Sequence, residues 1–353
     1  MDSTLKDRIM TALSQVEDPQ LRQDLVSLDM IAGLKASADV TELTLKLVSL
    51  RSAHRDSLEA AVRSALAELP GLGRLEVGFS DLLTDVQSEV LPGVKHVVSV
   101  GSGKGGVGKS TVAANLAAAL ALEGATVGML DADIYGPSQS RMFGVEGRRL
   151  LADDDKRILP LTSHGVRIIS IANLVEDGQA LTWRGPILHG TLTQMIQQTL
   201  WGELDYLIVD MPPGTGDVQL SLSQLVQLTG AVLVTTPQEV AMMDVRRAYS
   251  MLRKTHVPVL GIVENMSWYE LPDGERDHIF GEGGAARFAE KENIPLLGQV
   301  PIRSALRAAG DGGTPLVIAE PDNPVSLQLR RTARSLAGRI SQQALMSLPV
   351  MGG

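Results

Sequence analysis

The sequence predicts an α/β protein, with a large parallel-sheet domain over residues 94–353 and a small α+β domain ahead of it. Two observations predict the large domain. From Val94 onward, apolar strand candidates alternate with helical stretches, an order that produces a parallel sheet covered by helices on both faces. Residues 94–122 open this series with a β-branched apolar run, a glycine-rich turn and a segment whose apolar residues recur every four positions. The large domain therefore begins as strand, loop and helix.

The small domain is expected over residues 1–80, where the order of elements is αββαβ. Apolar residues at helical spacing and leucines alternating with polar residues identify its helices and strands. The predicted elements are a helix at 2–17, ended by Asp18-Pro19, strands at 30–35 and 40–50, a helix at 55–69 and a strand at 75–79. Residues 81–93 show no firm period and end in Pro92-Gly93, so they are predicted to be a linker.

The rest of the large domain is predicted from short apolar runs separated by helical stretches. Its further strands are expected at 125–130, 166–172, 205–210, 230–236, 257–263 and 294–300. Residues 144–160 carry three successive aspartates and are expected to form an exposed loop or a small hairpin.

Composition narrows the classes of function. The chain has 353 residues, more than one compact domain usually holds. A formal net charge of −9 argues against a surface that coats nucleic acid, and 3% aromatic residues argue against a base-stacking platform. The absence of cysteine excludes disulfides, thiolate metal sites and a cysteine nucleophile in this chain.

The N-terminal residues give an expectation of location. MDSTLKDRIMTALSQVED is amphipathic and carries acidic residues, so it lacks the build of a secretory signal. No run approaches the length needed to span a bilayer. We therefore expect a cytoplasmic protein without a membrane partner.

The glycine-rich turn fits G-x-x-x-x-G-K-[ST], a loop that binds phosphate. Its glycines let backbone N–H groups turn toward phosphate oxygens at a helix N-terminus, whose partial positive charge adds attraction. Lys109 is expected to reach the β- and γ-phosphates, and the Ser110 hydroxyl to ligate Mg²⁺. The predicted phosphate-binding residues are Gly103, Lys104, Gly105, Gly106, Val107, Gly108, Lys109, Ser110 and Thr111. These residues together predict a binding site for ATP with Mg²⁺.

An alternative fits part of the same turn. Gly101, Gly103 and Gly106 match G-x-G-x-x-G, and Asp131 follows about where a ribose contact would lie in a dinucleotide site. That pattern does not require Lys109-Ser110 to open the helix, so it explains less of the sequence.

Three carboxylates are expected beside the loop, because they follow strands whose carboxyl ends share one edge of the sheet. Asp133 is predicted to position or activate the attacking water, with Asp131 nearer the metal. The alternative for Asp131 is a cap on the following turn. Asp210 ends the apolar run Tyr206–Val209 and is predicted to hold Mg²⁺.

The segment after Asp210 has the composition of a nucleotide switch. Residues 211–217 read MPPGTGD, in which two prolines stiffen the turn and glycines such as Gly214 free N–H groups to sense the γ-phosphate. Asn265 ends a later strand and could pair with the adenine edge, and Pro301 could flank the same base. An Asn at a strand end can also be only a turn former.

With these motifs in place, the sequence resembles the deviant P-loop ATPases, and specifically the Mrp/ApbC iron–sulfur cluster carriers. The resemblance rests on GKGGVGKST, LDADIYGPS, Trp183-Arg184-Gly185-Pro186, DMPPGTGDVQL, TTPQEVA and ENMSW. Glu17-Asp18-Pro19 and Leu69-Pro70-Gly71-Leu72 resemble the small cluster-assembly module often fused ahead of this ATPase. The resemblance implies a P-loop NTPase fold with a deviant Walker A loop, iron–sulfur client or assembly proteins as partners, and an ATP-sandwich homodimer. In that dimer Lys104 would act catalytically beside Lys109 by reaching the partner's nucleotide, and Arg184 would shape the interface.

The chain departs from that family at the cluster ligands. Members usually carry Cys-x-x-Cys soon after ENMS, whereas Leu271 and Gly274 stand there in this chain, and residues 49–54 of the N-terminal module also lack cysteine. Iron–sulfur clusters are normally held by thiolates. Asp273, Asp277 and His278 are candidate ligands of another kind, although exposed loop residues are the simpler interpretation.

Two other functions fit the same loops. One is a positioning ATPase like MinD or ParA, favoured by the missing cysteines and by a final helix at 325–345. That helix has a basic face and an apolar stripe of Leu329, Leu336 and Ile340, which could bind a surface or pack on the sheet. The other is a scaffold that binds ATP as a switch without a cluster.

Overall fold

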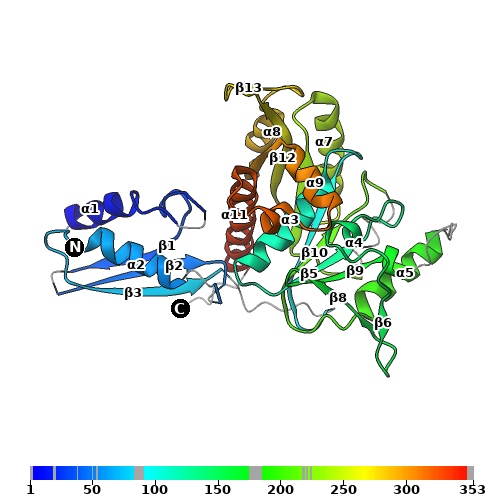
Figure 1. Ribbon diagram of the computed structural model, residues 1–353, viewed down its shortest axis with the longest axis horizontal. Coiled ribbons are helices and arrows are strands. Elements are labelled where there is room, and N and C mark those ends of the chain that lie inside the picture. Colours follow the sequence, from blue (N-terminus) through cyan, green and yellow to red (C-terminus); the bar gives the residue numbers. More distant parts are fainter. Residues whose placement is uncertain are drawn as a thin grey trace. The chain divides into compact units, whose positions relative to one another are not determined.

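The protein divides into two compact units in a computed structural model (Figure 1). The structure describes residues 3–18, 21–37, 39–49, 51–52, 55–82, 91–174, 185–216, 219, 222 and 225–347. One unit comprises residues 1–83 with 122–125, and the other comprises 84–121 with 126–353. Several residues singled out in the sequence lie outside the described ranges: Pro19, linker residues 83–90, Trp183, Arg184 and Asp217.

The N-terminal unit has the predicted order αββαβ. Its elements are α1 (Ser3–Leu13), β1 (Ile31–Ala36), β2 (Val40–Leu47), α2 (Arg55–Leu66) and β3 (Arg74–Asp81). β2 pairs with β1 antiparallel and with β3 parallel. Leu43, Leu45 and Leu47 alternate along β2 and are buried, so they form the apolar face of the sheet beneath the two helices.

The first helix is shorter than the sequence predicts. α1 ends at Leu13, and the chain then turns through hydrogen bonds from Gln15 N to Ala12 O and from Val16 N to Leu13 O. Val16 O accepts from Leu25 N, and Glu17 forms a bridge with Asp24. The apolar spacing continues past Leu13 because Val16 remains in the core, but the backbone there bonds to another segment.

The second unit is built on a sheet that has nine strands within the described residues. The strand order is β13-β12-β11-β4-β10-β5-β9-β8, and β14 also pairs with β12. The strands are β4 (Val94–Ser102), β5 (Val127–Asp131), β8 (Leu161–Ser163), β9 (Val166–Ser170), β10 (Leu204–Asp210), β11 (Gly230–Thr235), β12 (Val259–Glu270), β13 (Arg276–Asp277) and β14 (Leu296–Ile302). Among the described strands of this sheet, β8 and β13 alone pair antiparallel. The predicted α/β class with a parallel sheet is confirmed.

Helices connect most of the strands and also follow the last strand. They are α3 (Lys109–Leu122), α4 (Gln139–Met142), a 3-10 turn at Ile171–Asn173, α5 (Gly185–Gln197), α7 (Glu239–Lys254), α8 (Gly284–Glu292), α9 (Ser304–Asp311), α10 (Leu316–Ala319) and α11 (Pro324–Ser347). The segment 144–160 contains a small hairpin of β6 (Leu151–Ala152) and β7 (Ile158–Leu159), one of its two predicted forms.

One strand runs further than the sequence predicts. The run at 257–263 is only the start of β12, which continues to Glu270 and pairs with β13. The pairing with β14 shifts register between Asn265 and Tyr269, and Met266 has a positive φ of 56°. Alternation of apolar and polar residues is lost at such an irregularity, so the pattern could not reveal the extension.

The apolar stripe of the final helix is part of the core. α11 contacts β14 and β12, and Leu329, Leu336 and Ile340 are fully buried. The stripe is therefore not available to a surface, and the packing interpretation is correct. Within the described residues, no helix combines the length and apolar character that crossing a bilayer requires.

The central strands place polar residues side by side at the carboxyl edge of the sheet. Asp210 of β10 is in register with Asp131 of β5, and Asp131 is in register with Ser170 of β9. On the other side of β10, Asp210 is in register with Val100 of β4, shortly before the glycine-rich loop. Strand register therefore brings residues far apart in sequence to one place.

A buried histidine makes the unfolding free energy of the protein depend on pH. His96 on β4 is 1% exposed and packs against the Tyr206 ring with 5.7 Å between centroids. Burial, together with Lys95, lowers the pKa of His96 from 6.5 to about 4. Between pH 6.5 and pH 4, His96 therefore binds a proton in the unfolded chain but not in the folded chain. The unfolding free energy falls as the pH is lowered through this range.

We predict that His96 accounts for about 3 kcal/mol of the unfolding free energy lost between pH 7 and pH 4. Replacing it with Gln (H96Q) removes the titrating group at similar size. Denaturant unfolding across this range should show a shallower loss for H96Q than for the parent protein. Parallel pH profiles for the two proteins would contradict the assignment.

Candidate functional site

The glycine-rich loop joins β4 to α3 at the carboxyl edge of the sheet. Gly106 and Gly108 have φ values of 80° and 81°, a region that side chains with a Cβ rarely adopt. Val107 between them is 2% exposed and anchors the loop in the core. The loop therefore has a fixed path that ends with Lys109 in the first turn of α3.

Two neighbouring elements, α7 and β12, pack closely against glycines of the loop. A Cβ added to Gly103 would lie 2.3 Å from the backbone carbonyl carbon of Asp244 on α7, so only glycine fits there. At Gly108 a Cβ would lie 2.2 Å from Asn265 Nδ2. That same Nδ2 donates a hydrogen bond to Val107 O at 2.8 Å. Asn265 thus supports the phosphate loop from β12.

Lys109 is the centre of the site. Its side chain is 6% exposed. The ammonium group donates to a carboxylate oxygen of Asp210 and to Ser110 Oγ at 3.1 Å, and it lies 3.6 Å from Asp133 Oδ2. Asp210 is fully buried. A buried ammonium group and a buried carboxylate each cost free energy alone, so each compensates the other. The structure brings together Lys109, Ser110, Asp133 and Asp210, as the sequence predicts.

Gln139 also belongs to this cluster, and sequence reasoning missed it. It is the first residue of α4 and is fully buried. Its Nε2 donates to Ser110 O at 3.0 Å and to Asp210 Oδ2 at 2.8 Å. The only signal in the sequence is its position directly after LDADIYGPS, which gives no chemical reason to select it.

Asp131 is directed at the backbone of the next turn. Its carboxylate accepts from Ser138 N and Gln139 N, each at 3.0 Å, and from Ser170 Oγ at 2.9 Å. Burial and the neighbouring Asp210 raise the pKa of the Asp131 carboxyl to about 7. These contacts favour the alternative that the sequence left open, a cap on the following turn.

Asp133 lies closer to solvent than the other two carboxylates. Burial raises its pKa, and the Lys109 ammonium group opposes that rise. Its N–H donates to Asp131 Oδ1 at 3.3 Å, and its backbone oxygen accepts from Gly136 N at 3.2 Å. The turn therefore fixes the backbone of Asp133 while the carboxylate faces Lys109.

The segment after Asp210 is bonded to the phosphate loop. Gly214 N donates to Ser102 O at 2.9 Å, and Ser102 Oγ donates to Lys104 O at 2.9 Å. Gly214 has a φ of 95°, so its glycine identity matters for this turn. Lys104 and Thr111 are half-buried. The segment after Asp210 and the start of the phosphate loop are thus both bonded to Ser102 at the end of β4.

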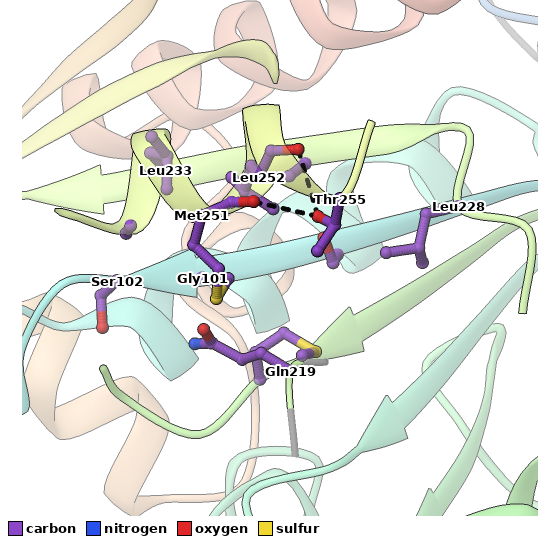
Figure 2. A pocket seen from close by; sticks show the side chains of 12 residues that line it. Gly101, Ser102, Gln219, Leu228, Leu233, Met251, Leu252 and Thr255 are labelled. Carbon is purple, nitrogen blue, oxygen red and sulfur yellow. Dashed lines mark hydrogen bonds between the residues drawn. The ribbon is translucent and has the colours of Figure 1, made fainter. Parts of the chain in front are cut away.

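A small apolar pocket lies between β4, β11 and α7 (Figure 2). Its volume of about 20 Å³ is close to the space of one water molecule. Gln219 forms part of the wall, with its amide pointing toward the Gly101–Ser102 end of β4, and it donates to Pro212 O at 3.0 Å (Figure 2). This pocket is too small for a nucleotide, and none of residues 103–111 lines it.

The two predicted base contacts come together at the neighbouring strands. Asn265 on β12 is in register with Val300 on β14, so Pro301 is the next residue along the paired strand. Asn265 is 4% exposed, and its amide nitrogen bonds to the phosphate loop. The structure therefore shows a contact between Asn265 and the phosphate loop that the sequence did not predict.

A β-hairpin occupies the segment where the resemblance described above implies cluster ligands. Tyr269 and Glu270 pair with Asp277 and Arg276, and Gly274 lies in the turn with a φ of 88°. Arg276 stacks over the Trp268 ring at 4.3 Å from its centroid, and Glu270 forms an ion pair with Arg303.

The candidate oxygen and nitrogen ligands of this hairpin have other contacts. Asp273 Oδ1 accepts from Glu275 N at 3.0 Å, and His278 Nδ1 lies 3.1 Å from Ser267 O. Across the described part of the chain, no group of three or more His, Cys, Asp or Glu could hold a metal ion. The hairpin does not form a metal centre there.

A parallel sheet whose first glycine-rich loop presents a lysine to strand-end carboxylates defines a P-loop NTPase. Residues 93–337 match the family described as ParA, NUBPL iron-transfer P-loop NTPase, and residues 6–78 match the iron–sulfur cluster assembly protein family. The chain belongs to the NUBPL iron-transfer P-loop NTPase family.

Individual relatives agree with this assignment. The iron–sulfur cluster carrier protein of Deinococcus radiodurans is 51% identical over 346 residues, which cover 98% of each chain. A nucleotide-binding protein from Archaeoglobus fulgidus, solved with ADP, is 41% identical, has a TM-score of 0.57 and covers 64% of this chain and 89% of that one. The MinD cell division ATPase of Pyrococcus furiosus is 24% identical and has a TM-score of 0.53. The match covers 68% of this chain and 97% of that one, and the two share the fold.

We predict that Gly103→Ala lowers the unfolding free energy by roughly 1–3 kcal/mol, because its Cβ would overlap the Asp244 backbone. The control is Gly101→Ala, since a Cβ there meets nothing within 4 Å. Thermal unfolding should show a lower melting temperature for G103A and no comparable change for G101A. Equal melting temperatures would contradict the close packing of the loop on α7.

Proposed function

We propose that the protein is an Mg²⁺-dependent ATPase that assists iron–sulfur cluster assembly or transfer on partner proteins. The observation that carries the proposal is the convergence of Lys109, Ser110 and Asp210 beside Asp133 at the carboxyl edge of the sheet. Relatives across nearly the whole chain are named iron–sulfur cluster carrier proteins, which supports the second half of the proposal.

Nucleotide binding in this proposal starts with an exchange of partners at Lys109. The phosphates bind the loop from Gly103 to Thr111, whose N–H groups and helix end favour negative charge. Lys109 leaves Asp210 for a phosphate oxygen, while Gly214 senses the terminal phosphate from the adjoining loop. Asn265 and Pro301 flank the base.

The residues that Lys109 releases fit Mg²⁺. The metal prefers oxygen ligands, and the Ser110 hydroxyl and the Asp210 carboxylate are oxygen donors that already contact the same ammonium group. Bound Mg²⁺ would neutralise charge on the phosphates. In this proposal Asp131 supports the site through the turn that it caps and does not ligate the metal itself, because its oxygens already bond to Ser138, Gln139 and Ser170.

Hydrolysis is assigned to residues around this core. Asp133 orients the attacking water, since it is the outermost of the three carboxylates and still faces Lys109. Lys109 offsets charge on the transferring phosphoryl group. Lys104 does the same across a homodimer, which links turnover to closure of two subunits around ATP.

The cluster itself is a substrate that this chain cannot hold with thiolates. It has no cysteine, and Leu271 and Gly274 lie in the hairpin turn where the ligands would be expected. In this proposal, therefore, the partner proteins supply the thiolates, and the ATPase acts on those partners. The same absence favours a nucleotide-switched scaffold as the second candidate function.

We predict that Asp133→Ala leaves ATP affinity within about twofold and lowers kcat by roughly 10²-fold or more, because it removes the group that orients water. Lys109→Ala is the matched control and should abolish nucleotide binding. Calorimetric titration and phosphate release measure the two effects. An unaltered rate in D133A would refute the role of Asp133, and unchanged affinity in K109A would refute the phosphate site.

We also predict that the protein alone binds no iron–sulfur cluster. After anaerobic incubation with ferrous iron and sulfide in thiol-free buffer, bound iron and sulfide should stay near zero, and ATP hydrolysis should persist. An apo-acceptor protein that carries cysteine thiolates, incubated in the same way, serves as the positive control. A cluster on the parent protein that moves to an apo-acceptor would overturn the prediction.

A further inference from the structure

The amide of Gln139 bridges the two residues to which the proposed function assigns Mg²⁺. One nitrogen, Nε2, donates both to the backbone oxygen of Ser110 and to the carboxylate of Asp210. The first contact fixes the turn of α3 that carries the Ser110 hydroxyl. The second fixes the end of β10. Lys109 also donates to both residues, but it is the partner that the proposed function moves to phosphate.

The two oxygens of Asp210 have different partners. Oδ1 accepts from the Lys109 ammonium group, and Oδ2 accepts from Gln139 Nε2 at 2.8 Å. Lys109 is the partner that nucleotide draws away in the proposed function. Because Asp210 is fully buried, a carboxylate with neither partner would be costly, and Gln139 is the hydrogen-bond donor that remains.

Gln139 is itself held by a chain of bonds across the sheet. Its backbone N–H donates to Asp131 Oδ2, and the same oxygen accepts from Ser170 Oγ. Asp131 and Ser170 lie on neighbouring strands in register with Asp210. The amide therefore has a position fixed by strand register, which is what a group that orients a metal ligand requires.

We propose that Gln139 is a positioning residue for Mg²⁺: it retains Asp210 Oδ2 so that Oδ1 alone is presented to the metal when Lys109 moves to phosphate. The inference rests on the proposed function and adds a residue to it. Gln139 touches neither the phosphate nor the reacting water in this role. Its effect is on the metal-dependent part of nucleotide affinity.

The test compares nucleotide affinity with and without the metal. Gln139→Met keeps the size of the side chain and removes the donor. Titration calorimetry with a non-hydrolysable ATP analogue should give Q139M an affinity in EDTA within about twofold of the parent value. In Mg²⁺ its affinity should be lower than that of the parent protein by about tenfold, the usual scale for loss of a residue that orients a metal ligand.

A matched control separates this effect from general loss of stability. Asn173 is also a buried amide, with Nδ2 donating to Val145 O and Arg148 O away from the phosphate loop. Asn173→Leu should lower the melting temperature without changing the ratio of affinities in Mg²⁺ and EDTA. Gln139→Asn keeps an amide on a shorter side chain, and it should lose part of the Mg²⁺ effect even if Q139M does not fold.

The outcomes distinguish the inference from the proposed function. If the parent protein gains affinity from Mg²⁺ and both Gln139 variants retain that gain, the positioning role is wrong and the proposed function stands. Equal losses in Mg²⁺ and EDTA also overturn the role, because they indicate structural damage alone. If the parent protein binds no nucleotide, or binds it without any Mg²⁺ effect, the proposed function fails and the inference fails with it.

Discussion

The contact between the Lys109 ammonium group and the Asp210 carboxylate is the interaction on which the rest of the site depends. Both groups are removed from water, and neither charge is tolerable there without the other. The pair requires the phosphate loop of β4 to lie beside the end of β10, which parallel pairing with exact register achieves. Asp131 and Ser170 extend the same row across β5 and β9. Fold and site are thus specified by the same strand register.

The sequence predicts the elements and the motif residues because both depend on local patterns. β-Branched apolar runs identify β4 and β10, and the spacing of glycine, lysine and serine identifies the loop. Gln139 could not be predicted, because its role depends on α4, α3 and β10 meeting in space. Asp131 could be placed at the sheet edge, but only its bonds to Ser138 and Gln139 distinguish a cap from a metal ligand.

The hairpin of β12 and β13 shows what the chain forms in the segment where cysteines were expected. A chain that had merely lost two thiolates could retain an open loop at that place. This chain instead closes the segment with backbone pairing, a stacked Arg276 on Trp268 and an ion pair between Glu270 and Arg303. The alternative ligands Asp273 and His278 are used in local contacts. The segment is therefore built as a folded element with its own stabilising interactions.

One strand joins the support of the phosphate loop to the outer hairpin. Asn265 holds the loop through Val107, and Trp268 at the base of the hairpin follows three residues later on β12. Between these two residues the pairing of β12 with β14 shifts register, and Met266 has a left-handed φ of 56°. The hairpin is therefore continuous in the chain with the residue that supports the phosphate loop, but an irregular segment separates the two.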